Sequence, residues 1–204
     1  NKVDIDLCDE AGAVCVQIRG YSRRVLEGEV GGKRAQSTTS LLLLPQWTVQ
    51  QAKSGATVPA PATRHVVVVT LKTDGSDQDA YTRWAHALAA RMGSDKASLL
   101  TAHGADIAAQ FCEATHSLFN IIKQILSAKP KDAMVLQVVV PGDGEGQLLE
   151  GLSGLLKTAR LESTKLSTQL IQATPGIPIE TFVDEMERCA TSGMAVLRHD
   201  GNQF

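Results

Sequence analysis

Short apolar runs alternate with longer amphipathic segments along most of this chain. Apolar runs of four to eight residues without polar alternation are typical of strands buried on both faces of a parallel sheet. Such runs predict strands over residues 66–71, 97–101, 134–140, 167–173 and 194–198. Apolar residues at helical spacing predict helices over residues 78–91, 105–127, 147–161 and 179–190. The order predicts an α/β fold of about five βα units, wound by right-handed crossovers with helices on both faces of the sheet.

The start of the chain follows a different pattern. Val3, Ile5 and Leu7 alternate with polar residues, and a second alternating run begins at Val14 after a turn-forming segment. This pattern predicts a β-hairpin over residues 2–19. An isolated hairpin is marginally stable in water, so we expect it to pack on another domain.

A polar stretch separates the hairpin from the α/β pattern. Residues 25–40 are rich in glycine, serine and threonine and are predicted to form a linker. Residues 41–47 then form a short apolar strand, which Pro45 restricts to a sheet edge or a strand end. We therefore divide the chain into a hairpin at residues 1–24, the linker, and a larger domain at residues 41–204.

Residues 147–173 are the most distinctive stretch of the larger domain, because an amphipathic helix leads there into a strand. Two glycines three residues apart on this helix each cost about 1 kcal/mol relative to alanine in an exposed helix, so we expect a neighbouring backbone to approach them closely. The residues expected to pack against the rest of the scaffold are Gly151, Leu152, Gly154, Leu155, Leu156 and Ala159.

Composition narrows the classes of partner. The formal net charge is -2 and both signs are mixed along the chain, so there is no basic surface for nucleic acid. The apolar runs are far shorter than the ~20 residues that cross a bilayer, and we expect a cytoplasmic protein that does not bind membranes. The four scattered cysteines are interpreted as reduced, buried thiols, with a Cys8–Cys15 disulfide across the hairpin as the less favoured alternative.

One glycine-rich turn raises the possibility of nucleotide binding. Residues 141–146 read PGDGEG and lie between a predicted strand and a predicted helix. A dinucleotide fingerprint has the pattern Gly-x-Gly-x-x-Gly, but Gln147 stands at the last glycine position. Asp143 and Glu145 also place negative charge where a phosphate would bind. An exposed acidic loop is the favoured interpretation.

The acid–base residues of reductases are absent from the sequence. Reductases built on such sheets use a tyrosine followed four residues later by a lysine, which lowers the pKa of the phenol. Tyr21 is followed at that spacing by Val25, and Tyr81 by Ala85.

Other reactive side chains form no convincing site. The five histidines show no spacing that places two imidazoles on one helix face as metal ligands. Cys112 and His116 lie one helical turn apart, but a thiol in the middle of a helix lacks the helix N-terminus that lowers its pKa. Trp47 and Trp84 are expected to pack in the core or at an edge, and Ser153 lies inside a predicted helix without the Gly-x-Ser-x-Gly elbow.

The amino-acid sequence of residues 147–173 resembles that of a known protein family. The segment GLSGLLKTARLE at residues 151–162, with the strand that follows, closely resembles the structural half of ketoreductase domains in modular polyketide synthases, especially those of the bacterial trans-acyltransferase kind. LLLLPQW at residues 41–47 and MAVLRHDGNQF at residues 194–204 are similar to the opening strand and the closing strand and turn of that half. Residues 3–24 resemble the closing hairpin of a dehydratase domain. The chain departs from the family at Ser163-Thr164, where a proline is usual, and this affects the turn after the helix.

In that family a ketoreductase consists of two Rossmann-like halves. The first is truncated, binds no cofactor and packs against the second, which holds NADPH and the catalytic serine, tyrosine and lysine. The resemblance implies that this chain is the first half, a truncated Rossmann-like fold with no catalytic, cofactor-binding or metal-binding residues of its own. Its partners would be the adjoining catalytic half, the dehydratase domain of the same polypeptide and the acyl carrier protein of the module.

Two alternatives remain at this point. The chain could be a pseudo-ketoreductase spacer next to a methyltransferase or an enoylreductase. It could also be a free-standing Rossmann-like enzyme that uses the turn at residues 142–146 for a nucleotide, an interpretation that the missing tyrosine–lysine pair disfavours.

Overall fold

The structure is a computed structural model that describes residues 2–22, 46–49, 63–72 and 76–199. The chain divides into two compact units, Asn1–Pro45 and Gln46–Phe204. The predicted linker and most of the predicted strand at residues 41–47 lie outside the described residues. Gln46 and Trp47, which are described, form no strand.

The predicted hairpin is confirmed in the first unit. Strand β1 (Val3–Cys8) pairs antiparallel with β2 (Val14–Tyr21). The cross-strand pairs Ile5–Ile18 and Leu7–Val16 carry apolar side chains, most of them exposed. On the alternate positions, which face the other side of the ribbon, Arg19 lies 3.7 Å from Asp4 and 3.3 Å from Asp6. Cys8 and Cys15 are free and exposed, so there is no disulfide here and the expectation of buried thiols is wrong for both.

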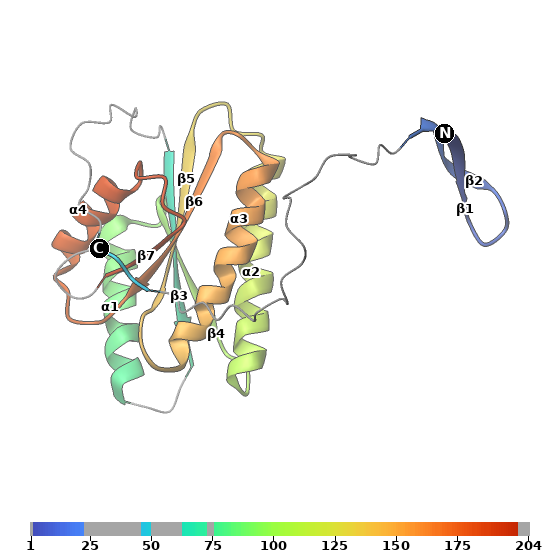
Figure 1. The fold of residues 1–204 in the computed structure, drawn as a ribbon. Coiled ribbons are helices and arrows are strands. Elements are labelled where there is room, and N and C mark those ends of the chain that lie inside the picture. Colours follow the sequence, from blue (N-terminus) through green and yellow to red (C-terminus); the bar gives the residue numbers. More distant parts are fainter. Residues whose placement is uncertain (1, 23–45, 50–62, 73–75, 200–204) are drawn as a thin grey trace, which may run out of the picture. The chain divides into compact units, whose positions relative to one another are not determined.

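The second unit is built on a five-stranded parallel sheet, as predicted (Figure 1). Four consecutive valines, residues 66–69, are fully buried in one of its interior strands, which is why the apolar runs identified the strands so well. The strand order is β4-β3-β5-β6-β7. Their bounds are β3 (Thr63–Leu71), β4 (Ala97–Ala102), β5 (Met134–Pro141), β6 (Leu166–Ala173) and β7 (Val196–Arg198).

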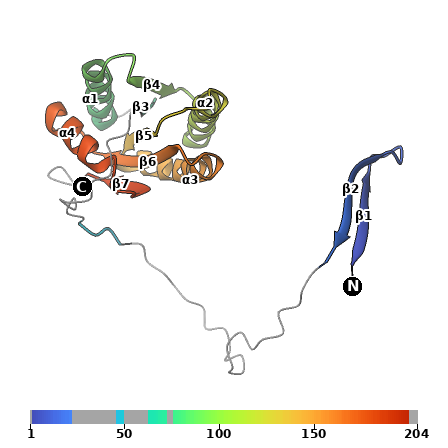
Figure 2. The same cartoon turned by 90° about the horizontal axis from the view of Figure 1, so that it is seen from above.

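Within the residues that the structure describes, four α-helices cover the two faces of this sheet. Figure 2 shows α1 and α4 on one face and α2 and α3 on the other. Their bounds are α1 (Ser76–Met92), α2 (Ile107–Ser127), α3 (Leu152–Glu162) and α4 (Ile179–Cys189). Helix α2 begins after Asp106, whose carboxylate accepts the backbone N–H of Ala109 at 2.8 Å. In the part of the chain that the structure describes, no helix is both long enough and apolar enough to cross a membrane.

Each face of the sheet has its own hydrophobic core. Alternate residues of one strand point to opposite faces, so Val67 and Val69 pack under α2 and α3, whereas Val66 and Val68 pack under α1 and α4. The α1/α4 core also holds three aromatic side chains, Tyr81, Trp84 and Phe182.

The last crossover, from β6 through α4 to β7, differs in hand from the others, so the prediction that all crossovers are right-handed is wrong for it. The steps β5-α3-β6 and β6-α4-β7 move along the sheet in the same direction, but α3 and α4 lie on opposite faces (Figure 2). The crossover through α4 is therefore opposite in hand to the other three. About 98 % of such crossovers are right-handed, so specific contacts must hold α4 on its face.

Those contacts lie at both ends of α4. Before the helix, Ile177 is buried in the α1/α4 core, and its carbonyl accepts the indole N–H of Trp84 at 2.9 Å. At the other end, the side-chain amide of Gln137 donates to Met186 O at 2.9 Å, and that of Gln169 donates to Cys189 O at 2.8 Å. Two buried glutamines of the sheet thus satisfy carbonyls at the C-terminal end of α4, which have no partner within the helix.

The helix predicted at residues 147–161 begins later than expected. A 3-10 helix, η1 (Gly144–Gly151), precedes α3 and shifts the phase of the apolar positions. Leu149 is consequently buried, whereas Leu148, which the helical spacing placed on the apolar stripe, is 58% exposed.

Candidate functional site

Ligands of open parallel sheets bind outside the carboxyl ends of the strands, where the connections on the two sides of a switch point lead to opposite faces. In this fold the switch point lies between β3 and β5, because the chain leaves β3 toward β4 on one side and leaves β5 toward β6 on the other side. The glycine-rich turn after β5 lies at this place. It is the candidate site for a nucleotide.

Two of the three glycines of this turn, Gly142 and Gly146, pack closely within the chain, whereas Gly144 has open space around it. The N–H of Gly142 donates to Ala173 O at 2.9 Å, which closes the turn against the end of β6. A side chain on Gly146 would overlap the ring of Pro141, so the absence of a Cβ there accommodates the proline. Asp143 and Glu145 are exposed, in agreement with an acidic surface segment. Ala173 and Pro141 therefore occupy the space beside Gly142 and Gly146, and a pyrophosphate could not approach the backbone at these two positions.

The loop after β4 is occupied by a carboxylate of the chain itself. Glu113 accepts the backbone N–H of His103 at 2.7 Å and that of Gly104 at 3.1 Å. Successive backbone N–H groups of this kind form anion-binding concavities in other proteins. Because Glu113 supplies the anion from α2, these N–H groups are already satisfied.

A second residue of α2 joins two neighbouring loops at the same end of the sheet. The amide of Gln110 donates to Lys72 O at 2.7 Å and to Gly104 O at 3.1 Å, so it links the segments that follow β3 and β4. The sequence analysis missed both Gln110 and Glu113. The sequence does hold one sign of Gln110, because it places an amide on the buried stripe of the helix, one turn after Ile107. The other buried positions of that stripe carry apolar residues.

Tyr81, the tyrosine of the second unit, lies on α1, and its environment disfavours acid–base catalysis. The side chain is 1% exposed, and its hydroxyl has no hydrogen-bond partner among the described residues. Burial, and secondarily the negative charge of Asp143, raises the pKa of the phenol well above its ordinary value. A catalytic tyrosine needs the opposite shift, since its proton must be transferred readily.

The other reactive residues considered from the sequence are not brought together. Cys112 and His116 are both exposed on α2, which corrects the expectation that Cys112 is buried. His65 bonds to Ser98 Oγ at 3.1 Å, and His199 lies 2.6 Å from a carboxylate oxygen of Glu185. In the described parts of the chain, no three histidine, cysteine, aspartate or glutamate side chains are grouped so that they could hold a metal ion.

The two tryptophans differ in burial, since Trp84 lies in a hydrophobic core and Trp47 is half-exposed. Trp84 is buried in the α1/α4 core and packs edge to face on Phe182 at 5.0 Å between ring centroids. Trp47 is 51% exposed, and the Arg198 guanidinium lies 5.9 Å from its ring centroid. Ser153 lies half-buried within α3, as the sequence predicted for a helical position.

The residues proposed for scaffold packing behave differently from one another. Leu152, Leu156 and Ala159 are buried in the α2/α3 core, and Leu155 is partly buried against it. A Cβ on Gly151 would lie 3.1 Å from two ring carbons of Phe111 on α2, so the close neighbour there is a side chain and not a backbone. For Gly154 the expectation is wrong, because no atom of the described residues would lie within 4 Å of an added Cβ.

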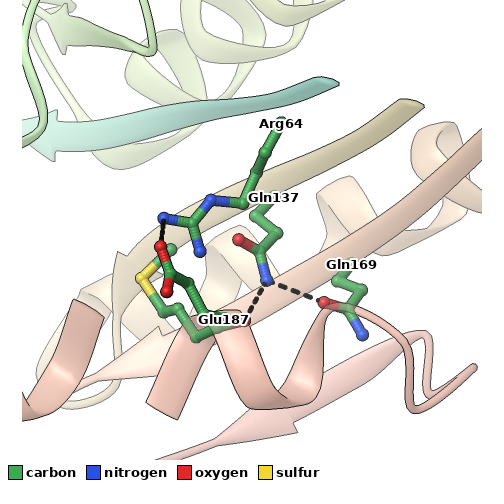
Figure 3. Close-up of polar contacts among 5 residues, drawn as sticks. Arg64, Gln137, Gln169 and Glu187 are labelled. Atoms are coloured by element: carbon green, nitrogen blue, oxygen red, sulfur yellow. Dashed lines mark hydrogen bonds and ion pairs between the residues drawn. The ribbon is translucent and has the colours of Figure 1, made fainter. Parts of the chain in front are cut away.

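A buried polar cluster lies near the opposite, N-terminal end of the strands (Figure 3). Gln137 and Gln169 face each other across β5 and β6, and the Gln137 amide donates to Gln169 Oε1 at 2.9 Å. Arg64 pairs with Glu187 at 3.0 Å, and burial lowers the pKa of its guanidinium while the glutamate partly opposes that shift. One Arg64 nitrogen and the Gln137 oxygen are buried without a partner among the described residues.

A cavity that Gln169 helps to line lies at the N-terminal end of the strands, which is not the end where such sheets bind nucleotides. It measures about 240 Å³, and its lining includes Met134, Ser167, Gln169, Gly193 and Met194. Met134 and Ser167 stand at the beginning of β5 and β6. Since ligands of such sheets bind at the carboxyl ends, the cavity does not extend the candidate site.

No protein-family profile matches the chain. Polyketide synthase PksN of Bacillus subtilis (strain 168) is 34% identical over 174 residues, which are 85% of this chain. Polyketide synthase PksL of the same organism is 34% identical over 186 residues, or 91% of this chain. The chain spans only 3% and 4% of the lengths of these two relatives.

A solved structure shares the fold. The crystal structure of a ketoreductase domain from the bacillaene assembly line superposes with a TM-score of 0.50 and 22% sequence identity. The match covers 79% of this chain and 34% of the ketoreductase chain.

Proposed function

Because this chain is homologous to the polyketide synthases PksN and PksL and has a ketoreductase fold, we propose that it is the non-catalytic structural subdomain of a polyketide synthase ketoreductase. In this role it braces the adjoining half, which binds NADPH and reduces β-ketoacyl groups carried on an acyl carrier protein. The dehydratase domain of the same polypeptide would precede it.

The observation that carries this proposal is the filling of the carboxyl end of the sheet by the chain's own groups. Glu113 occupies the loop N–H groups after β4, and Pro141 fills the space beside Gly146. A dinucleotide needs open backbone N–H groups and glycines that let the pyrophosphate approach. Among the residues that the structure describes, the loops after β4 and β5 are each closed by an internal contact.

The extent of the structural match supports the same proposal. The chain corresponds to about a third of a solved ketoreductase chain, which leaves the larger part of such a domain for a second half. The buried, high-pKa phenol of Tyr81 also fits a supporting half, since the proton donor would come from elsewhere.

The direct test is a titration of the full 204-residue chain with NADPH by calorimetry and by nicotinamide fluorescence. We expect no saturable binding. Binding with micromolar affinity would refute the proposal and favour the free-standing nucleotide-binding enzyme. The variant Glu113→Gln keeps the shape of the side chain but removes its charge. It is the matched control for electrostatic repulsion between the Glu113 carboxylate and the phosphates of NADPH. We expect no binding by it either, because the turn after β5 remains filled.

A second experiment tests bracing itself. The catalytic half of the synthase ketoreductase is produced alone and together with this chain. We expect a stable complex, a higher melting temperature of the catalytic half and faster NADPH oxidation when the two are together. A catalytic half that is equally stable and active without this chain contradicts the bracing role and favours a spacer.

A further inference from the structure

Four buried side-chain atoms in the described part of the chain have no hydrogen-bond partner there. They are a nitrogen of Arg64, the hydroxyl of Tyr81 and the side-chain oxygens of Gln110 and Gln137. A buried polar group without a partner is costly, and proteins satisfy such groups with ordered water. One molecule can satisfy two of these atoms only where a donor and an acceptor lie close together.

Their places in the fold leave one such pair. Gln110 lies on α2, which covers the face of the sheet opposite to α1 and α4. Tyr81 lies on α1, where the charge of Asp143 in the turn after β5 acts on its phenol. Arg64 stands instead at the beginning of β3, at the other end of the sheet. Arg64 and Gln137 remain as the donor and the acceptor that can share a molecule.

Arg64 and Gln137 reach the same turn of α4 from neighbouring strands. Val66 pairs with Gln137 across β3 and β5, and Arg64 precedes Val66 by two residues, so both side chains lie on one face of the sheet. Arg64 Nη2 donates to a carboxylate oxygen of Glu187 at 3.0 Å. Gln137 Nε2 donates to the carbonyl of the preceding residue, Met186, at 2.9 Å. The two side chains therefore end side by side under α4.

The orientation of the Gln137 amide follows from its neighbours. Its nitrogen donates to the carbonyl of Met186 and to Gln169 Oε1, which are both acceptors. The nitrogen of Gln169 is engaged on its other side by the carbonyls of Cys189 and Met194, at 2.8 and 3.2 Å. An amide of Gln137 turned the other way would place oxygen against oxygen. The Gln137 oxygen is therefore directed away from these partners, toward Arg64 (Figure 3).

The buried nitrogen of Arg64 supplies what this oxygen lacks. Arg64 Nη1 carries N–H donors and has no acceptor among the described residues, whereas Nη2 pairs with Glu187. Figure 3 shows Nη1 and the Gln137 oxygen on the facing sides of the two groups. The two atoms make no direct hydrogen bond. A water molecule between them can accept from the nitrogen and donate to the oxygen.

The charges around the two atoms also favour a neutral molecule. The Arg64 cation is already paired with the Glu187 carboxylate, and the Gln137 oxygen would repel an anion. The guanidinium would repel a metal ion. Both atoms are enclosed by the chain, so the molecule must be small as well as able to donate and accept. Water meets these conditions.

We propose that a buried water molecule bridges Arg64 Nη1 and Gln137 Oε1 beneath the last turn of α4. The water joins β3 to the glutamine pair of β5 and β6, whose bonds continue to the last carbonyls of α4. Since the crossover through α4 has the uncommon hand, this network helps to fix the helix on its face. The site does not depend on the proposed bracing function, because it lies at the opposite end of the sheet from the candidate nucleotide site.

Magnetic relaxation dispersion of water oxygen-17 tests the site on the full chain in solution, because it counts buried waters that exchange slowly. We expect Gln137→Met, which removes the acceptor, and Arg64→Met, which removes the donor, each to lose one such water relative to the wild type. Glu187→Gln keeps an acceptor for Arg64 and is the matched control, which should retain the water. Circular dichroism checks folding, and Arg64→Met alone decides if Gln137→Met does not fold. An unchanged count in a folded variant of either residue overturns the proposal.

The bridge also couples two residues that do not touch. The fall in the urea midpoint caused by Arg64→Met should be much smaller in the Gln137→Met background, because the water has already lost its acceptor there. Glu187→Gln combined with Gln137→Met should give additive falls. Additive falls for Arg64→Met and Gln137→Met contradict the bridge.

A high-resolution crystal structure separates a bridge from a direct bond. We expect a solvent peak within about 2.7–3.2 Å of both Arg64 Nη1 and Gln137 Oε1. A structure in which Arg64 donates directly to Gln137, with no peak between them, overturns the proposal.

Discussion

Gly151 and Gly154 show how one residue type serves different purposes within a single turn of chain. The first lies against the ring of Phe111, with 3.1 Å left for an added Cβ, and the second has open space around it. From the sequence, we expected a neighbouring backbone to pack closely against both glycines. Only the neighbour on α2, which lies 40 residues away in the sequence, distinguishes them.

We expect Gly154→Ala to stabilise the chain by about 0.5–1 kcal/mol, because the added methyl meets no atom and the helix loses a flexible residue. Gly151→Ala should be neutral or destabilising, because its methyl must displace the Phe111 ring. Thermal unfolding separates the two, since 1 kcal/mol shifts the melting temperature of a domain this size by about 2–4 °C. An equal rise in both variants contradicts the close contact at Gly151.

His65 links stability to pH through its partial burial. Burial lowers the pKa of its imidazole below the ordinary value, so the folded state favours the neutral ring. The unfolded chain takes up a proton as the pH falls below about 6.5, and the folded chain does so only at a lower pH. The contribution of His65 is therefore fully present above about pH 6.5 and is lost as the pH falls toward the folded pKa.

The variant His65→Gln keeps a hydrogen-bonding group beside Ser98 and cannot titrate. We expect its urea midpoint to fall less than that of the wild type between about pH 7.5 and about pH 5.5. The effect is modest because the ring is only partly buried. The same fall in both proteins would show that His65 is not responsible.

At the scale of elements, the sequence predicted strands more reliably than the path of the chain between them. Consecutive valines in β3 and β5 leave few alternatives to a strand buried on both faces. The face covered by α4 could not be predicted, because an amphipathic pattern shows that a helix has a buried side but not which side of the sheet it meets. That choice depends on bonds between distant residues, such as the one from Trp84 to the Ile177 carbonyl.

Trp84→Phe tests that bond while retaining most of the aromatic packing on Phe182. We expect a loss of about 1–3 kcal/mol, because the Ile177 carbonyl is left without its donor at a buried position. Hydrogen exchange should increase most at the start of α4. Trp47→Phe is the matched control and should change stability by less than about 1 kcal/mol, because Trp47 is half-exposed and contributes one exposed cation–π contact.

At the scale of the whole molecule, the candidate site was predicted only in part. The acidic residues and the missing glycine of the turn after β5 are visible in the sequence, and the structure shows Asp143 and Glu145 exposed. The closure of the loop after β4 by Glu113 is not visible, because it requires a side chain of α2 to fold back over the preceding loop. Contacts between elements therefore decide whether this edge of the sheet can accept a ligand.

The division into two units predicts which part of the chain carries the stability of the sheet. All five parallel strands, both hydrophobic cores and the Trp47–Arg198 contact lie within residues 46–204. A chain truncated to residues 46–204 should therefore melt within about 1 °C of the full chain. A chain truncated to residues 63–204 should melt slightly lower, because it loses the contact between Trp47 and Arg198, worth about 0.5–1 kcal/mol.

A fall of several degrees on removing residues 1–45 would contradict this division and would show that the hairpin packs on the sheet unit. If the melting temperature is unchanged, the hairpin adds nothing to the stability of the sheet unit, as expected for a two-stranded hairpin with an exposed apolar face, which is marginal by itself. Hydrogen exchange of the hairpin amides in the full chain separates the two cases. Rapid exchange there, together with unchanged protection in β3 and β5, is the result expected for a hairpin that does not pack on the sheet unit.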